Sequence, residues 1–217
     1  MLRGHGLTES RGESVRNRLV VMLALVAMVG ACGGDGGLST STTTATHAST
    51  TAPGAAPVWT RLPVDEAIFG GPGGQVVRGV ARGDAGVVAV GYDDSGGELD
   101  AAVWVSPDGA TWTRIPHDEA IFGGAGSQVM WAVAAGGPGF VAVGSDDSGG
   151  DQDAAVWTSS DGASWTRVTH DEIALGGPSW QEMYAVVWTG RGLIAVGASD
   201  VAGGADAAVW ASPDGLA

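Results

Sequence analysis

Carboxylates recur in three loops that are rich in glycine and serine. The loops span residues 93–100, 146–153 and 199–206, and each contains at least two aspartates. Oxygen-rich, glycine-flexed loops suit calcium, which takes about six to eight oxygen ligands. The candidate calcium ligands are Asp94, Asp100, Asp147 and Asp153. The spacing differs from an EF-hand loop, and a solvated acidic turn is the alternative, because aspartate, glycine and serine are also ordinary turn residues.

Arginine and aromatic side chains form a second group of candidates. They stand where three otherwise similar segments of the chain differ, and they are Arg78, Trp131, Tyr184, Trp180 and Trp188. Such side chains can stack on a sugar ring or anchor a peptide. The alternative is packing between neighbouring sheets, since aromatic residues at strand positions commonly pack. The sequence therefore predicts either a ligand-binding surface or a set of filler residues here.

Two histidines recur beside acidic pairs but do not form a recognisable catalytic pattern. His117 and His170 each precede Asp-Glu, whereas the equivalent residue of the first segment is Val64. The sequence has no Ser/His/Asp arrangement and no histidine spacing typical of a metal site. Its single cysteine excludes an internal disulfide and a cysteine-based zinc site. We interpret the histidines as loop residues and name no catalytic residue.

The charge balance restricts the partners. The formal net charge is −14, the chain has no lysine, and four of its ten arginines precede residue 20. So acidic a chain is repelled by a phosphate backbone. Nucleic acid is therefore not expected as a partner.

The secondary-structure elements that position these residues come from one sequence unit that occurs three times. Tryptophans recur at a spacing of 53 residues in two series, which are Trp59, Trp112 and Trp165, and Trp104, Trp157 and Trp210. A fixed period near 50 residues indicates a repeat architecture. Four short strand-like runs recur in each copy; in the second they span residues 129–134, 140–144, 154–158 and 165–168. We predict an all-β fold, a β-propeller with three four-stranded blades from about 59–111, 112–164 and 165–217.

A motif in the repeats resembles a known family. Residues 106–112, SPDGATW, and 159–165, SSDGASW, resemble the Asp-box, or BNR repeat, of sialidase-like propellers, and residues 212–215 begin a third copy. Both are one residue shorter than the usual Ser-x-Asp-x-Gly-x-Thr-Trp form. The resemblance implies a structural turn formed by Ser106, Asp108, Gly109, Trp112, Ser159, Asp161, Gly162, Trp165, Ser212, Asp214 and Gly215. It also implies that the first strands and the acidic loops lie near one mouth of the propeller.

The same resemblance raises the question of catalysis. Sialidases of this fold use three arginines, a tyrosine nucleophile with a glutamate partner, and an acidic acid/base. Arg61, Arg114 and Arg167 take the same strand position in every copy, and Tyr92 and Tyr184 match no nucleophile motif. We expect a non-catalytic binding or scaffolding module with a glycan or protein ligand. A sialidase-like glycoside hydrolase fragment, with its catalytic blades missing, is the alternative.

Residues 1–31 are typical of an export signal. Arginines precede an unbroken apolar run, residues 19–29, which is too short to span a bilayer comfortably. The tetrapeptide VGAC at residues 29–32 resembles the lipobox of bacterial lipoproteins. This implies a lipid on Cys32 and anchoring to the outer face of the bacterial cytoplasmic membrane. The alternative is an ordinary secreted protein that is cut after Ala31.

The rest of the chain divides into a tether and the repeats. Residues 32–57 consist mainly of Gly, Ser, Thr, Ala and Pro, a composition that cannot bury a core and favours a flexible tether. Residues 58–217 hold only three repeats, whereas closed propellers typically have about four to eight blades. Two interpretations stay open: a fragment of a longer protein, or a protomer that closes six blades as a homodimer.

Overall fold

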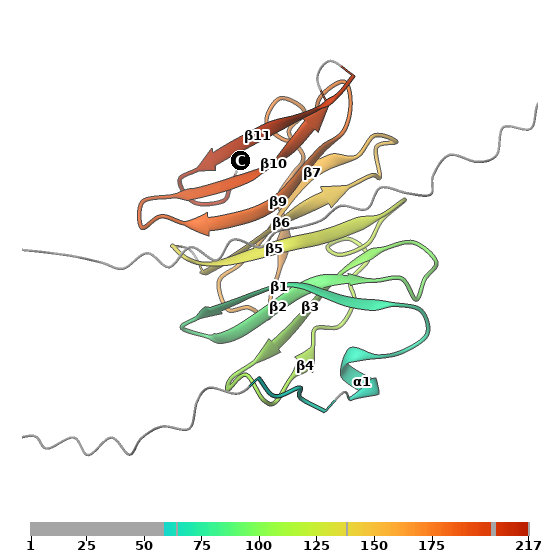
Figure 1. The fold of residues 1–217 in the computed structure, drawn as a ribbon, viewed down its shortest axis with the longest axis vertical. Coiled ribbons are helices and arrows are strands. Elements are labelled where there is room, and N and C mark those ends of the chain that lie inside the picture. Colours follow the sequence, from blue (N-terminus) through green and yellow to red (C-terminus); the bar gives the residue numbers. More distant parts are fainter. Residues whose placement is uncertain (1–58, 64, 138, 201–202, 217) are drawn as a thin grey trace, which may run out of the picture. The chain divides into compact units, whose positions relative to one another are not determined.

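A computed structural model describes residues 59–63, 65–137, 139–200 and 203–216, which belong to one unit, Pro57–Ala217 (Figure 1). The predicted signal peptide, the lipidation site Cys32 and most of the predicted tether lie outside the described residues. Within the described part of the chain, no helix is long and apolar enough to cross a membrane.

Strands dominate the described residues and form three antiparallel sheets. The first sheet consists of β1 (Gln75–Gly83), β2 (Gly86–Asp93), β3 (Asp100–Ser106) and β4 (Thr113–Arg114). The second consists of β5 (Gln128–Gly136), β6 (Gly139–Asp146), β7 (Asp153–Ser159) and β8 (Thr166–Arg167). The third consists of β9 (Gln181–Trp188), β10 (Leu193–Asp200) and β11 (Ala205–Ser212), and one short helix, α1 (Glu66–Phe69), precedes β1. The all-β prediction is therefore confirmed. The prediction of four strands per repeat is confirmed for the first two sheets, whereas the third has three described strands, and the propeller arrangement stays a prediction.

Each sheet is a meander in which consecutive strands pair, as short glycine turns between apolar strands favour. Gln75 pairs with Asp93 and Gln128 with Asp146, so the start of each first strand lies beside the end of the second. The acidic loops follow directly after Asp93 and Asp146. The segment leading into each first strand therefore shares one end of its sheet with an acidic loop.

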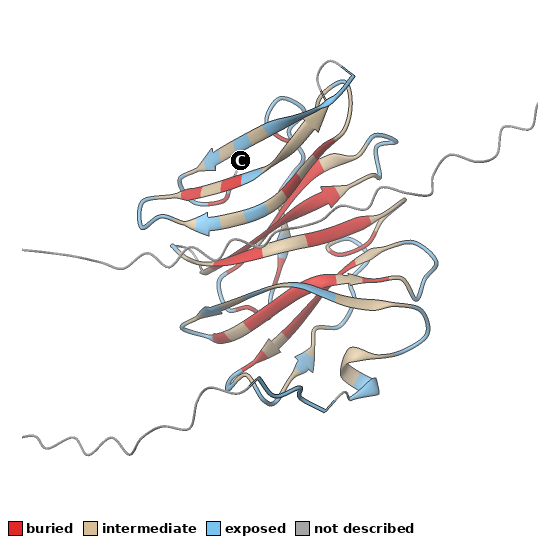
Figure 2. Ribbon diagram, in the orientation of Figure 1, coloured by how far each residue is buried: buried red, intermediate tan, exposed pale blue. Residues whose placement is uncertain are grey.

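The three sheets stack face to face. β1 packs against β5, and β5 packs against β9 (Figure 1). Val90, Phe140 and Trp157 lie in the core between the first and second sheets, and Val143 and Met183 lie in the core between the second and third. Figure 2 shows the buried residues concentrated in the first two sheets, whereas β11 contains none. The second sheet is thus covered on both faces, and the described sheets form an open stack.

Candidate functional site

Each first strand contains a β-bulge, a point where one residue has no partner on the neighbouring strand. The register of β1 against β2 passes from Val77 directly to Gly79, so Arg78 is unpaired. By the same criterion Trp131 is unpaired in β5 and Tyr184 in β9. Bulges re-aim side chains and are over-represented next to active sites. The three unpaired residues belong to the set that the sequence suggested as ligand contacts.

A glycine on the second strand makes each bulge feasible. Gly91, Gly144 and Gly197 lie where a Cβ atom would overlap a backbone carbonyl of the first strand; for Gly144 this is the carbonyl of Val129. Any other residue would push the two strands apart. The sequence contains the signal, because an isolated glycine inside a strand pattern suggests a bulge or a close backbone approach. The bulges were not predicted from the sequence.

The unpaired side chains form a continuous line across the three sheets, the bulge row, which consists of Arg78, Trp131 and Tyr184. The Arg78 guanidinium carbon lies 4.8 Å from the centroid of the Trp131 ring and 5.3 Å from that of Tyr92. The rings of Trp131 and Tyr184 meet edge to face, with centroids 6.5 Å apart and planes at 78°. Arg78 is exposed, whereas the two aromatic residues are half-buried.

A single carboxylate organises the polar side of the row. Oε1 of Glu182 accepts hydrogen bonds from Nε1 of Trp131 at 2.9 Å, from Nε2 of Gln152 at 2.9 Å and from Oγ of Ser145 at 3.3 Å. Burial raises the pKa of the Tyr184 phenol, and a hydrogen bond with Glu182 raises it further. The phenol therefore stays neutral at physiological pH, and the indole of Trp131 is held in one orientation.

The other two aromatic candidates lie apart from the row. Trp188 is at the far end of β9, where its indole packs so closely on Gly136 and Gly137 that neither glycine has room for a Cβ atom. Trp180 precedes β9, and its carbonyl accepts a hydrogen bond from the Asp200 backbone at 2.9 Å. Trp188 thus packs between neighbouring sheets, which is the alternative to ligand binding for these aromatic residues.

The candidate calcium ligands divide into two kinds. Asp94 and Asp147 accept hydrogen bonds from the backbone N–H groups of Gly74 and Ser127, and so hold the segments leading into β1 and β5. Asp100 and Asp153 begin β3 and β7, and burial raises the pKa of both carboxyls. Calcium binding stays a prediction.

A different group brings metal-ligating atoms together in the described part of the chain. One ligand atom from each of Asp153, His170 and Glu172 lies within 4.8 Å of the others. Nε2 of His170 is 3.7 Å from Oδ2 of Asp153 and 3.1 Å from Oε2 of Glu172. In the preceding repeat, Nε2 of His117 lies 3.0 Å from Oε2 of Glu119. Of the four predicted calcium ligands, this cluster includes only Asp153.

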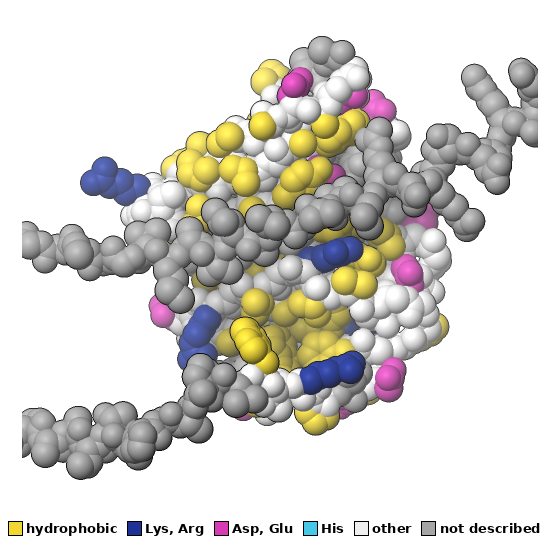
Figure 3. Space-filling model, in the orientation of Figure 1, with side chains coloured by type: hydrophobic (Ala, Val, Ile, Leu, Met, Phe, Trp, Pro, Cys, Tyr) yellow, Lys and Arg dark blue, Asp and Glu magenta, His cyan; other side chains and the backbone are white. Residues whose placement is uncertain are grey.

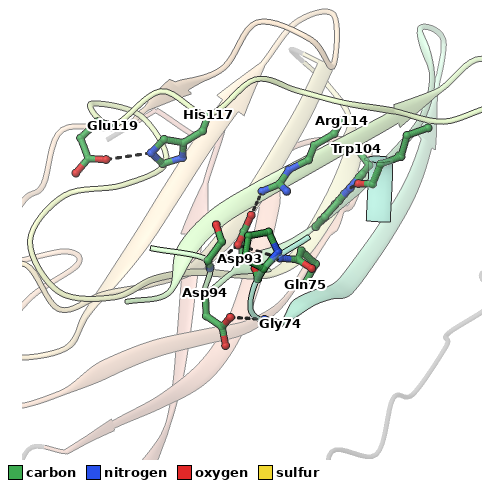
Figure 4. A network of polar contacts seen from close by, with 11 residues as sticks. Gly74, Gln75, Asp93, Asp94, Trp104, Arg114, His117 and Glu119 are labelled. Carbon is green, nitrogen blue, oxygen red and sulfur yellow. Dashed lines mark hydrogen bonds and ion pairs between the residues drawn. The ribbon is translucent and has the colours of Figure 1, made fainter. Parts of the chain in front are cut away.

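The repeated arginines have a structural role. Arg114 pairs with Asp93 and lies over the Trp104 ring, with its guanidinium carbon 5.7 Å from the centroid (Figure 4). Burial acts to raise the pKa of Asp93, but Arg114 and the hydrogen bonds from Ser95 and Gln75 outweigh it and bring the pKa to about 2.

The second repeat reproduces this arrangement. Arg167 pairs with Asp146 and lies 5.7 Å from the Trp157 centroid. In the first and second sheets the arginine thus fastens the short fourth strand to the end of the second strand.

The Ser-x-Asp-Gly turns have a common hydrogen-bond pattern. Oδ1 of Asp161 accepts from the backbone N–H groups of Ala163 at 2.8 Å and Ser164 at 2.7 Å, while Nε1 of Trp165 donates to the Gly162 carbonyl at 2.8 Å. Gly162 has a φ of +77°, which favours glycine. The turn at Asp108 has the same bonds, and Asp214 accepts from Leu216 at 2.9 Å.

Comparisons with known proteins identify no relative, since no family model, curated protein or solved structure matches this chain. The function therefore has to be argued from the chemistry of the site.

Proposed function

We propose that this chain is a non-catalytic binding module of the Asp-box β-propeller type, anchored by a lipid on Cys32 to the outer face of the bacterial cytoplasmic membrane. The ligand binds along the bulge row. The observation that carries the proposal is that three separate bulges direct Arg78, Trp131 and Tyr184 into one line, where the repeats differ most in residue type.

The chemistry of the row favours an acidic glycan. Aromatic faces pack against sugar rings, and a guanidinium binds a carboxylate through paired hydrogen bonds. Arg78 forms no ion pair among the described residues, so its donors are available apart from a 3.3 Å bond to Tyr92. In the view of Figure 3, arginine and apolar side chains lie among the described residues toward the middle, and most of the acidic side chains lie toward the edge. The carboxylate of Glu182 also lies on the row, but its Oε1 already accepts three hydrogen bonds, so we expect Arg78 to supply the contact with an anionic ligand.

The environment of the tyrosine and arginines supports binding over hydrolysis. A tyrosine nucleophile needs a phenol that ionises easily, whereas the pKa of Tyr184 is raised. Arg114 and Arg167 are engaged by Asp93 and Asp146. Among the described residues, these arginines belong to separate sheets and do not converge with Arg78 on one anion.

A glycan array that contains acidic and neutral sugars tests the proposal with the full chain. We expect binding to carboxylated glycans, with at least tenfold weaker affinity for Trp131→Ala and Arg78→Ala, which corresponds to about 1.4 kcal/mol. Arg82→Ala is the matched control, since Arg82 is also exposed on β1. Equal loss in all three variants, or no preference for acidic glycans, would contradict the proposal.

A further inference from the structure

The outer face of the third sheet is apolar and uncovered in the described part of the chain. Val187, Val196 and Val209 are exposed there. The repeat places Val209 in the position of Val103, which is only 1% exposed because the second sheet covers it, whereas Val209 is 69% exposed. The third sheet thus presents the same kind of face that the first sheet buries.

The opposite end of the stack presents the complementary face. Val77 and Val80 are exposed on the first sheet and correspond to Met130 and Val133 of the second. Those two residues are buried against the first sheet, so exposure falls from 63% at Val80 to 8% at Val133. The exposed parts of these two faces are therefore equivalent to the two halves of an interface that the chain already forms internally, although Trp104 on the outer face of the first sheet already packs against Phe69 and Trp112.

A cavity of about 260 Å³ lies between the second and third sheets, and its lining is mostly apolar. Its lining includes Val141, Met183, Leu193 and Trp210. Each of these lining residues lies one repeat after a residue of the core between the first and second sheets. The earlier residues are Val88, Met130, Phe140 and Trp157, and the buried Trp165 packs in the same core. An apolar cavity of roughly 150 Å³ already holds a benzene molecule, so this one has room for an indole.

A tryptophan that is equivalent to Trp165 in the repeat is exposed at the other end of the stack. Trp59 is fully exposed and precedes Thr60-Arg61, just as Trp165 precedes the Thr166-Arg167 of β8. Residues 59–63 lie at the end of the stack that holds β4 and α1, and β11 lies at the opposite end (Figure 1). Because the second sheet separates the two ends, Trp59 of the same chain does not reach the cavity.

We propose that residues 59–61 of a second copy of this chain add to β11 as a fourth strand, with Trp59 filling the cavity. The second copy's first sheet then covers the exposed face of the third sheet. Strand addition supplies main-chain hydrogen bonds, and the pocket for the side chain supplies specificity. The contact joins two different surfaces of the chain. When each copy makes this contact with the other, the two copies form a closed dimer.

The repeats define the register of the added strand. Thr158 pairs with Thr166 and Trp157 with Arg167, and Val105 with Thr113 in the first sheet. The equivalent pairs are Ala211 with Thr60 and Trp210 with Arg61. Arg61 then lies over the Trp210 ring, as Arg114 lies over Trp104.

Disulfide trapping tests the register in the full chain with Cys32→Ser as background. One preparation carries Thr60→Cys and the other Ala211→Cys, so only a contact between two copies gives a cross-link. Directly opposed strand residues have Cα atoms about 4.5–5.5 Å apart, within the range of a disulfide. Ala207→Cys is the matched control, because Ala207 is exposed on the same strand and four residues away. We expect covalent dimers with position 211 and not with position 207.

Light scattering provides a second measurement in the same Cys32→Ser background. We expect twice the mass of one chain, and a single-chain mass for Trp59→Ala with an unchanged circular dichroism spectrum. Trp131→Ala leaves the dimer intact, so failure of the ligand proposal is distinguishable from failure of this one. A single-chain mass before substitution, or cross-links that form equally at positions 207 and 211, would overturn the inference.

Discussion

The guanidinium of Arg78 lies over the indole of Trp131, with 4.8 Å between the Arg78 Cζ atom and the ring centroid, although the two residues come from different sheets. Cation–π contacts contribute roughly 0.5–2 kcal/mol, depending on their exposure. Because Glu182 also accepts a hydrogen bond from the N–H at the edge of the same indole, the ring is oriented before any ligand arrives. Such preorganisation reduces the entropy lost on binding.

The bulge glycines provide a test of how the row is positioned. In Gly144→Ala, the new methyl group would overlap the Val129 carbonyl, so β5 and β6 must separate locally. We expect a loss of roughly 2–4 kcal/mol in the free energy of unfolding, measured by urea denaturation. Gly149→Ala is the control, because its Cβ atom would have only one ordinary contact, with Asp153. Equal stability of the two variants would show that the strands can accommodate a Cβ atom at the bulge.

The ion pair of Asp93 with Arg114 predicts an acid-sensitive stability. The pKa of Asp93 is about 2 in the folded state, below its ordinary value near 3.8. The folded protein therefore binds fewer protons than the unfolded chain, so the stabilisation is complete above about pH 4 and is lost as the pH falls toward 2. We expect Asp93→Asn to be about 1–2 kcal/mol less stable at pH 7 and to show a flatter decline in acid.

Thermal unfolding between pH 7 and pH 2 measures this difference. Asp84→Asn is the control, because Asp84 is exposed and lies in the turn between β1 and β2. If the stability of Asp93→Asn falls with pH as steeply as that of the unsubstituted protein, groups other than Asp93 cause the acid sensitivity.

The Ser-x-Asp-Gly turns are expected to contribute to stability and not to binding. In Asp161→Ala, the backbone N–H groups of Ala163 and Ser164 lose their acceptor, and the loop that supports Trp165 loosens. We expect a loss of about 1–2 kcal/mol in chemical denaturation with ligand affinity unchanged. Asp151→Ala, in an exposed loop, should leave both quantities unchanged. A selective loss of affinity in Asp161→Ala would indicate a role in the site.

The proposed lipid anchor makes membrane attachment depend on the side chain of Cys32. If Cys32 is lipidated, Cys32→Ser removes the thiol and the protein should leave the membrane fraction. Cell fractionation followed by immunoblotting measures the distribution, and Ser41→Ala in the same segment is the control. Membrane association that is unchanged in Cys32→Ser would refute the lipid anchor.

The sequence predicted the sheets better than the site. The recurring tryptophans and the glycine-bounded apolar runs indicated four strands per repeat, because hydrophobic pattern and turn chemistry act locally. The edge-to-face contact of Trp131 with Tyr184 depends on bulges and on sheet stacking, which strand periodicity does not report. The approach of His170 to Asp153 joins residues 17 positions apart, through the loop after β8. The short helix α1, whose cap is Asp65, was also not predicted.

At the bulges, a strand residue is free of the two requirements that a paired residue meets, which are strand register and core packing. A paired residue must suit both the register and the core, whereas Arg78, Trp131 and Tyr184 have no partner across the ladder and are three different residue types, one cationic and two aromatic. The backbone around them is nevertheless the same in every repeat. Each residue of the bulge row can therefore be substituted without changing the sheets. Three point substitutions on an unchanged scaffold would be enough to change the ligand that the protein binds.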